Sequence, residues 1–243
     1  MKQIFFLFAL IISIVHTGSA TDIINVTSAE VVAQSGLTLR AEASKYSDII
    51  EVIPFGESVS ILEETRHNEE RINWVDGGWV KVEFEGTAGY VFDGFLSQLP
   101  TPLKEFELVG DDLDFTYAFE SWMDYRFVQI QMSDTTMRED DFAKITQYLE
   151  NDQLMIQQDR PGYYMVEGVL SDVRIMDVYH LFLNMVPDKI NRKYVADQTI
   201  FLEDENLEVD EIKIQLDKQV KIKRLDNGQI KVRLYSPHSG CSL

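Results

Sequence analysis

The sequence is poor in cysteine and in positive charge. Cys241 is the one cysteine among 243 residues, so no intramolecular disulfide can form and the fold must rely on its hydrophobic cores. Twenty-two basic residues stand against 41 acidic ones, giving a net charge of −19. Such a surface repels phosphate backbones and anionic lipids, so nucleic acid is a poor partner. The charge either steers cationic ligands to the protein or keeps it soluble.

The sequence also lacks an apolar run long enough to cross a membrane. Residues 4–15 form its main run, and twelve helical residues span about 18 Å against a hydrocarbon core of about 30 Å. Lys2 precedes this run, and Gly18 and Ala20 follow it at the positions that a signal peptidase reads. The pattern predicts a cleaved signal peptide over residues 1–20, and hence a periplasmic or extracellular protein without a membrane span. The alternatives are an uncleaved anchor or a buried strand.

Signatures of catalysis are missing as well. The chain has no Gly-x-Ser-x-Gly elbow, no His-Glu-x-x-His motif and no phosphate-binding glycine loop. Cys241 and His238 lie in a polar tail that offers a nucleophile no rigid support, and two ligands are fewer than zinc requires. His180 stands alone within a predicted helix, where a structural role is expected. We therefore predict no catalytic residue, no cofactor and no metal site.

What the sequence does contain is enough apolar material for one or two cores. Hydrophobic residues make up 45% of the chain and aromatic residues 11%. From residue 29 to 99 the apolar residues come in short runs separated by turns, the pattern of an all-β domain. Pro54 and Gly56 supply the dihedral angles of one such turn. The charged residues 63–71 predict an exposed loop.

Two motifs in this region are specific. The first contains Leu37-Thr38-Leu39-Arg40 and, after an apolar run, Pro54-Phe55-Gly56-Glu57-Ser58-Val59. The second contains Gly78-Trp79-Val80-Lys81-Val82 and Gly89-Tyr90-Val91. In this order the motifs resemble the bacterial SH3 (SH3b) domains, and we assign residues 21–99 to such a domain. The chain departs from the family pattern in a longer, charged segment over residues 65–77.

The resemblance implies a small β-barrel without catalytic residues of its own. Such modules in exported proteins recognise cell-wall peptides or position a neighbouring domain. Aromatic side chains at the mouth of a small barrel offer flat apolar area at little entropic cost. The candidate ligand-binding residues are Tyr46, Trp74, Trp79 and Phe92. For Trp79 the alternative is that it fills the barrel, whereas Trp74 adjoins the charged segment and favours a surface contact.

A different pattern follows the barrel. Residues 100–104 hold two prolines and predict a linker, and residues 105–243 predict an α+β domain with two helices and C-terminal antiparallel hairpins. Thr136 and Glu139 form a capping box that predicts one helix. The expected elements are a strand at 126–132, helices at 136–151 and 171–186, a hairpin at 154–166, and strands at 212–216, 220–223 and 230–234.

Two charged clusters of this domain have open interpretations. The acidic cluster from Glu203 to Glu211 either binds a cation or forms a solvated loop, and it lacks the spacing of an EF-hand. Lysines alternate with apolar residues over residues 213–231, which predicts the solvent face of a sheet. This basic face is also able to dock an acidic partner.

The sequence predicts a non-catalytic binding or accessory protein of the bacterial envelope, whose ligand is a peptide of the cell wall, such as peptidoglycan, or a partner protein. A cell-wall hydrolase that uses carboxylates of the C-terminal domain is the alternative, and it requires two carboxylates facing each other across a pocket. In a third interpretation the barrel only packs against the second domain.

Overall fold

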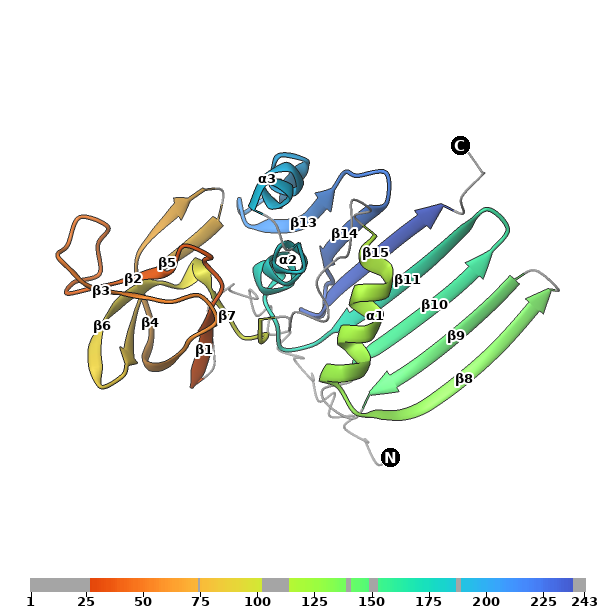
Figure 1. Cartoon of the computed structure of the whole chain (residues 1–243), viewed down its shortest axis with the longest axis horizontal. Helices are drawn as coiled ribbons and strands as arrows, with labels where there is room; N and C mark the ends of the chain where they lie inside the picture. Colours follow the sequence, from red (N-terminus) through yellow and green to blue (C-terminus); the bar gives the residue numbers. More distant parts are fainter. Residues whose placement is uncertain are drawn as a thin grey trace, which may run out of the picture.

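Two antiparallel sheets and three helices make up the part of the chain that the structure describes (Figure 1). This computed structural model describes residues 27–73, 75–101, 114–138, 141–148, 153–186 and 189–237. The predicted signal peptide, Trp74, His238 and Cys241 lie outside these ranges, and so does most of the predicted linker.

The first sheet is a curled, seven-stranded structure. Ile53 from one edge strand and Leu96 from the other belong to the same buried cluster, so the sheet bends round a single core. Short alternating strands with glycine turns favour such curvature. In spatial order the strands are Ile49–Ile53 (β3), Leu37–Arg40 (β2), Thr87–Phe92 (β6), Val75–Phe84 (β5), Ser58–Ile72 (β4), Ser28–Val31 (β1) and Leu96–Ser97 (β7).

One part of this sheet contradicts the sequence prediction. Residues 63–71, expected as an exposed loop, continue strand β4 as one arm of a long hairpin with β5. Charged residues are tolerated there because they pair across the strands: Lys81 Nζ lies 2.9 Å from Glu63 Oε1, and Arg71 Nε lies 2.6 Å from Asp76 Oδ1. The polar composition therefore reflected a solvent-facing hairpin and not a loop.

The second sheet has eight strands and carries the predicted hairpins. The hairpin around residues 160–163 and the strands at the C-terminal end are confirmed, and Gly228 adopts the positive φ of 83° that its tight turn requires. In spatial order the strands are Thr199–Glu203 (β12), Val209–Ile214 (β13), Gln219–Arg224 (β14), Ile230–Pro237 (β15), Tyr163–Leu170 (β11), Leu154–Arg160 (β10), Asp141–Tyr148 (β9) and Gln129–Arg138 (β8).

The predicted helix at residues 136–151 is wrong. Strands β8 and β9 occupy this region, and β9 pairs with β8 on one side and β10 on the other. Both edges of its backbone are thus hydrogen-bonded within the sheet, which outweighs a local helix-capping signal. Thr146 and Tyr148 are buried, whereas Ile145, just before Thr146, is 37% exposed and Gln147, between them, is exposed, the alternation of a strand with one covered face.

The helices pack against the second sheet. Helix α1 (Phe115–Arg126) was not predicted, although Phe115, Phe119 and Trp122 recur at helical spacing and are all buried. Helix α2 (Ile175–Asn184) lies within the helix predicted at 171–186 and confirms it, and helix α3 (Lys189–Asp197) follows. Helix α2 lies between the two sheets, so its residues are buried on nearly every side (Figure 1).

The two halves share one core. The buried cluster of the second sheet and its helices extends into the barrel through Val75, Trp79 and Phe92. A second, smaller cluster lies wholly inside the barrel. The barrel aromatics therefore face the C-terminal half and not solvent, and any site near them is built from both halves.

Candidate functional site: a cleft between the barrel and helices α2 and α3

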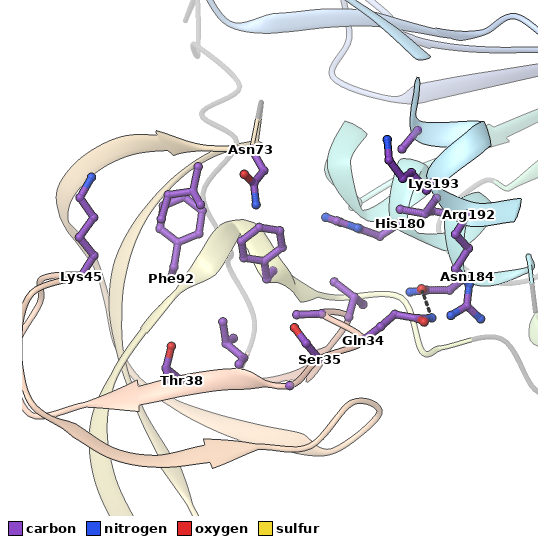
Figure 2. A pocket seen from close by; sticks show the side chains of 18 of the residues that line it. Gln34, Ser35, Thr38, Lys45, Asn73, Phe92, His180, Asn184, Arg192 and Lys193 are labelled. Atoms are coloured by element: carbon purple, nitrogen blue, oxygen red, sulfur yellow. Dashed lines mark hydrogen bonds between the residues drawn. The ribbon is translucent and has the colours of Figure 1, made fainter. Parts of the chain in front are cut away.

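A cleft of about 580 Å³ lies where the barrel meets helices α2 and α3 (Figure 2). This volume is within the range of about 300–1,000 Å³ that small-ligand sites occupy. The turn between β1 and β2 forms one wall, the rings of Trp79, Phe92 and Phe95 form apolar surface, and the helices close the other side. The helices contribute His180, Leu183, Asn184, Arg192, Lys193 and Ala196.

The barrel wall follows from the sequence of β2 and the turn before it. Gly36 has a φ of +82°, and a Cβ there would lie 2.6 Å from Val52 Cγ1, so only glycine lets the turn approach β3 this closely. Strand alternation then buries Leu39 in the barrel and turns Thr38 and Arg40 the other way, where both line the cleft.

A polar bridge joins the two walls. Gln34 Nε2 donates a hydrogen bond of 3.1 Å to Asn184 Oδ1, and Figure 2 shows these side chains meeting at one end of the cleft. Asn184 is 4% exposed, and its Nδ2 is buried without an acceptor in the described part of the chain. An unsatisfied buried donor costs about 1–3 kcal/mol, so this amide is an unfilled hydrogen-bonding position.

The cleft is basic although the chain is acidic. Arg40, Lys45, Arg192 and Lys193 line it, and none of its described lining residues is an aspartate or glutamate. The Arg40 guanidinium lies 5.8 Å from the centroid of the Trp79 ring, a cation–π contact. Its Nη1 donates a hydrogen bond of 2.6 Å to the Ser47 carbonyl. Its Nε is buried without an acceptor among the described residues.

Carboxylates beyond the lining balance part of this charge. Glu70 accepts from Lys45 Nζ at 2.6 Å and from Trp79 Nε1 at 3.0 Å, and these bonds hold the indole in place. The hydrogen bond from Lys45 lowers the pKa of Glu70, which keeps this carboxylate charged. On α3, Lys193 pairs with Asp197 at 2.6 Å.

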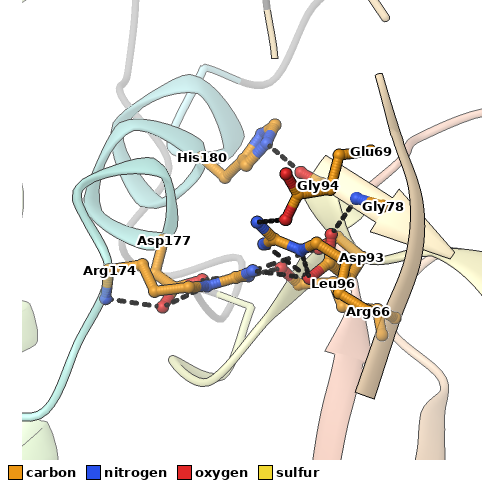
Figure 3. Close-up of polar contacts among 9 residues, drawn as sticks. All are labelled: Arg66, Glu69, Gly78, Asp93, Gly94, Leu96, Arg174, Asp177 and His180. Carbon is orange, nitrogen blue, oxygen red and sulfur yellow. Dashed lines mark hydrogen bonds and ion pairs between the residues drawn. The ribbon is translucent and has the colours of Figure 1, made fainter. Parts of the chain in front are cut away.

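A buried ion network beside the cleft fixes α2 to the barrel (Figure 3). Asp93 is fully buried and accepts from Arg66 Nη2 at 2.7 Å and from the Gly78 amide at 2.9 Å. Arg174, at the start of α2, donates to the backbone carbonyls of Asp93 and Leu96 and pairs with Asp177 at 2.8 Å. Since every charge has a nearby opposite charge, the network is held in one geometry.

His180 belongs to the same contact surface. Its Nε2 donates to the Gly94 carbonyl at 3.2 Å, and its ring lies 6.0 Å from that of Phe95. Burial lowers the pKa of His180 to about 4, so the ring is neutral at ordinary pH. These contacts join α2 to the barrel.

The structure brings two of the four predicted site residues into the cleft. Trp79 and Phe92 are 3% and 2% exposed, with ring centroids 6.2 Å apart. Tyr46 is 87% exposed on the loop before β3 and is not among the lining residues. Trp74 lies outside the described residues. Sequence reasoning missed Gln34 and Asn184, because they lie 150 residues apart and no local sequence pattern predicts their contact.

Carboxylates of the second half have structural partners. On α1, Glu120 accepts from the Tyr164 hydroxyl, and Asp124 accepts from the Tyr148 hydroxyl at 2.7 Å. Burial raises the pKa of Glu120. Both tyrosines come from the sheet, so these bonds anchor α1 to it.

The two charged clusters of the second half take defined positions. Asp204 accepts from the backbone amides of Asn206 and Glu208, at 2.8 and 3.0 Å, and thereby shapes the turn between β12 and β13. Within the described ranges, no three His, Cys, Asp or Glu side chains are arranged to hold a metal ion. Lys213 and Lys221 face each other across β13 and β14 with side chains 39% and 42% exposed, in keeping with the predicted solvent face, and both pair with Glu211.

Comparisons with known proteins identify the barrel. Residues 35–97 match the family model of the bacterial SH3 domain, so the chain contains such a domain, as its motifs indicated. No curated protein and no solved structure matches the chain. None of the described helices has the length and apolar character needed to cross a membrane.

Proposed function

We propose that this protein is a non-catalytic binding protein of the bacterial envelope, which holds a peptide ligand in the cleft between its SH3 domain and helices α2 and α3. The observation that carries the proposal is the cleft itself, with its volume of about 580 Å³ and the apolar rings of Trp79, Phe92 and Phe95. Concave apolar sites with a few placed polar groups are the usual sites of ligand binding.

The identity of the barrel supports an envelope ligand. Bacterial SH3 domains commonly bind cell-wall components, and residues 1–20 carry the pattern of an export signal. The ligand is accordingly a peptide of peptidoglycan or a segment of an envelope partner. Trp79 is held in place by Glu70 and Arg40, and a fixed aromatic surface binds at low entropic cost.

Blocking the cleft tests the proposal. Ala196 is exposed on α3 at the edge of the cleft, so Ala196→Trp adds a ring to the opening without disturbing a core. We expect the wild-type protein to be retained on purified peptidoglycan or to capture an envelope protein, and Ala196→Trp to lose most of that retention. Lys223→Trp, on the exposed face of β14, is the matched control and should bind like the wild type.

Three outcomes would decide against the proposal. Equal retention of the wild type and Ala196→Trp would place binding elsewhere, and Trp74→Ala in the same assay tests the remaining predicted aromatic residue. No retention on any envelope material would favour a barrel that only packs against its neighbour. Release of soluble fragments from peptidoglycan by the purified protein would favour the hydrolase alternative.

A further inference from the structure

The polar groups of the cleft are biased towards donors. Four cationic side chains line it, and its described lining contains no carboxylate, on a chain with 41 acidic residues. The Asn184 Oδ1 acceptor is already taken by Gln34. A ligand that enters this cleft therefore meets positive charge and N–H groups over an apolar floor, together with the hydroxyls of Ser35 and Thr38 and the amide of Asn73.

Two of these donors lack hydrogen-bond partners among the residues that the structure describes. Asn184 Nδ2 and Arg40 Nε are both buried, and neither has an acceptor in the described part of the chain. They come from opposite walls, Asn184 from the end of α2 and Arg40 from β2. Buried N–H groups are nearly always satisfied, so each marks a place for an acceptor supplied from outside.

The geometry points to a carboxylate-bearing peptide as the ligand, and we infer that Arg40 and Asn184 supply its polar recognition while the aromatic floor holds its apolar side chains. This inference rests on the proposed function and specifies its ligand class. A carboxylate accepts several hydrogen bonds at once and pairs strongly with a guanidinium. The Trp79 ring beneath Arg40 orients that guanidinium.

The net negative charge of the protein means that an acidic peptide is retained only at a local basic site such as the cleft. A surface with a net charge of −19 repels acidic peptides in general. Retention of an acidic peptide thus requires a local basic site. The lysines on the open face of the second sheet form another basic patch, but Lys213, Lys221 and Lys231 there already pair with Glu211 and Glu167.

A competition between two peptide pools tests the inference. The full chain without residues 1–20 is immobilised and mixed with equal amounts of random tetrapeptides that end in a free carboxylate and of the same tetrapeptides that end in an amide. Mass spectrometry then identifies the retained tetrapeptides and measures the ratio of free acids to amides. We expect the free acids to be enriched about tenfold over the amides, with aspartate and glutamate over-represented, and the enrichment to weaken as salt screens the charges.

Two cleft variants and one control locate the effect. Arg40→Gln removes the guanidinium, and Asn184→Asp keeps the bond from Gln34 while replacing the free donor by an acceptor. Both should reduce the enrichment about tenfold, whereas Lys223→Gln on the open face should leave it unchanged. A thermal melt of each variant confirms that it is folded.

The outcomes separate this inference from the proposed function. Retention of acids and amides alike, abolished by Ala196→Trp, would overturn the carboxylate inference and leave the peptide-binding cleft standing. Enrichment that survives in Arg40→Gln and Asn184→Asp but disappears in Lys223→Gln would place acid recognition on the open face of the sheet. That result would also overturn the carboxylate inference. No retention of either pool at low salt would overturn both.

Discussion

At the scale of single residues, His180 couples the fold to pH. It is 4% exposed and donates from Nε2 to the Gly94 carbonyl across the contact between α2 and the barrel. Burial penalises its charged form and lowers its pKa to about 4, against about 6.5 in an unfolded chain. Between about pH 4 and pH 6.5, His180 is therefore neutral in the folded protein and protonated in the unfolded chain.

The sign of the pH effect follows from this difference. Above about pH 6.5 the ring is neutral in both states and its contribution to stability is complete. As the pH falls from about 6.5 to about 4, only the unfolded chain binds the proton, and the free energy of unfolding drops by on the order of 1.4 kcal/mol per pH unit. Below about pH 4 the loss levels off.

We expect His180→Gln, which keeps a donor for Gly94, to lose this component of the pH dependence. The measurement is the free energy of urea unfolding between pH 7.5 and 4.5 for the variant and the wild type. His67→Gln is the matched control, because the His67 side chain is 39% exposed. Parallel profiles for wild type and His180→Gln would show that His180 takes up its proton equally in both states.

At the scale of elements, one glycine sets how closely helix α1 packs on strand β11. A Cβ on Gly168 would lie 2.6 Å from Phe119 Cζ, and Phe119 is fully buried and stacked on Phe182 with ring centroids 5.5 Å apart. The ring fills the space that a side chain on the strand would need. The helix, the strand and α2 are thus coupled through a single aromatic contact.

Gly168→Ala should destabilise the protein by about 1–3 kcal/mol, the usual cost of overpacking a core. Thermal melts and urea unfolding give this value. In the double variant with Phe119→Leu the smaller side chain relieves the clash, so the alanine should cost less than it does alone. Equal costs in both backgrounds would mean that the contact with Phe119 does not limit the packing.

At the scale of the whole molecule, the two halves are joined by buried charge as well as by a shared core. Asp93 of the barrel is fully buried beside Arg66 and lies 3.8 Å from Arg174 of the C-terminal half. Breaking a buried ion pair leaves an uncompensated charge, which is far more costly than losing an exposed pair. The junction is therefore a rigid element and not a flexible hinge.

Asp93→Asn is expected to lower stability by about 3–5 kcal/mol, because it leaves two buried guanidinium groups facing a neutral amide. Scanning calorimetry measures the change. Lys193→Gln, which removes an exposed pair on α3, should change stability by less than about 0.5 kcal/mol. A similar small change for Asp93→Asn would show that water reaches the network and screens it.

Sequence-local features were predictable. Apart from residues 63–71 of β4, the strands of the barrel and the hairpins around Gly162 and Gly228 could be predicted from the sequence, because alternation and turn chemistry act over a few residues. Helix α2 was predictable from its apolar spacing, and α1 had the same signal in Phe115, Phe119 and Trp122. The capping box at residue 136 failed because pairing with β10, set by the sheet as a whole, outweighed it.

By itself, the sequence determined the bacterial SH3 barrel, the α+β character of the second half and the positions of most turns. Only the tertiary structure decided where the barrel aromatics face and what meets them there. Trp79 and Phe92 were recognisable as candidate site residues, but their partners Gln34 and Asn184 come together through packing between distant segments. Such contacts depend on how two folded elements that are distant in sequence pack together, and no short stretch of sequence encodes them.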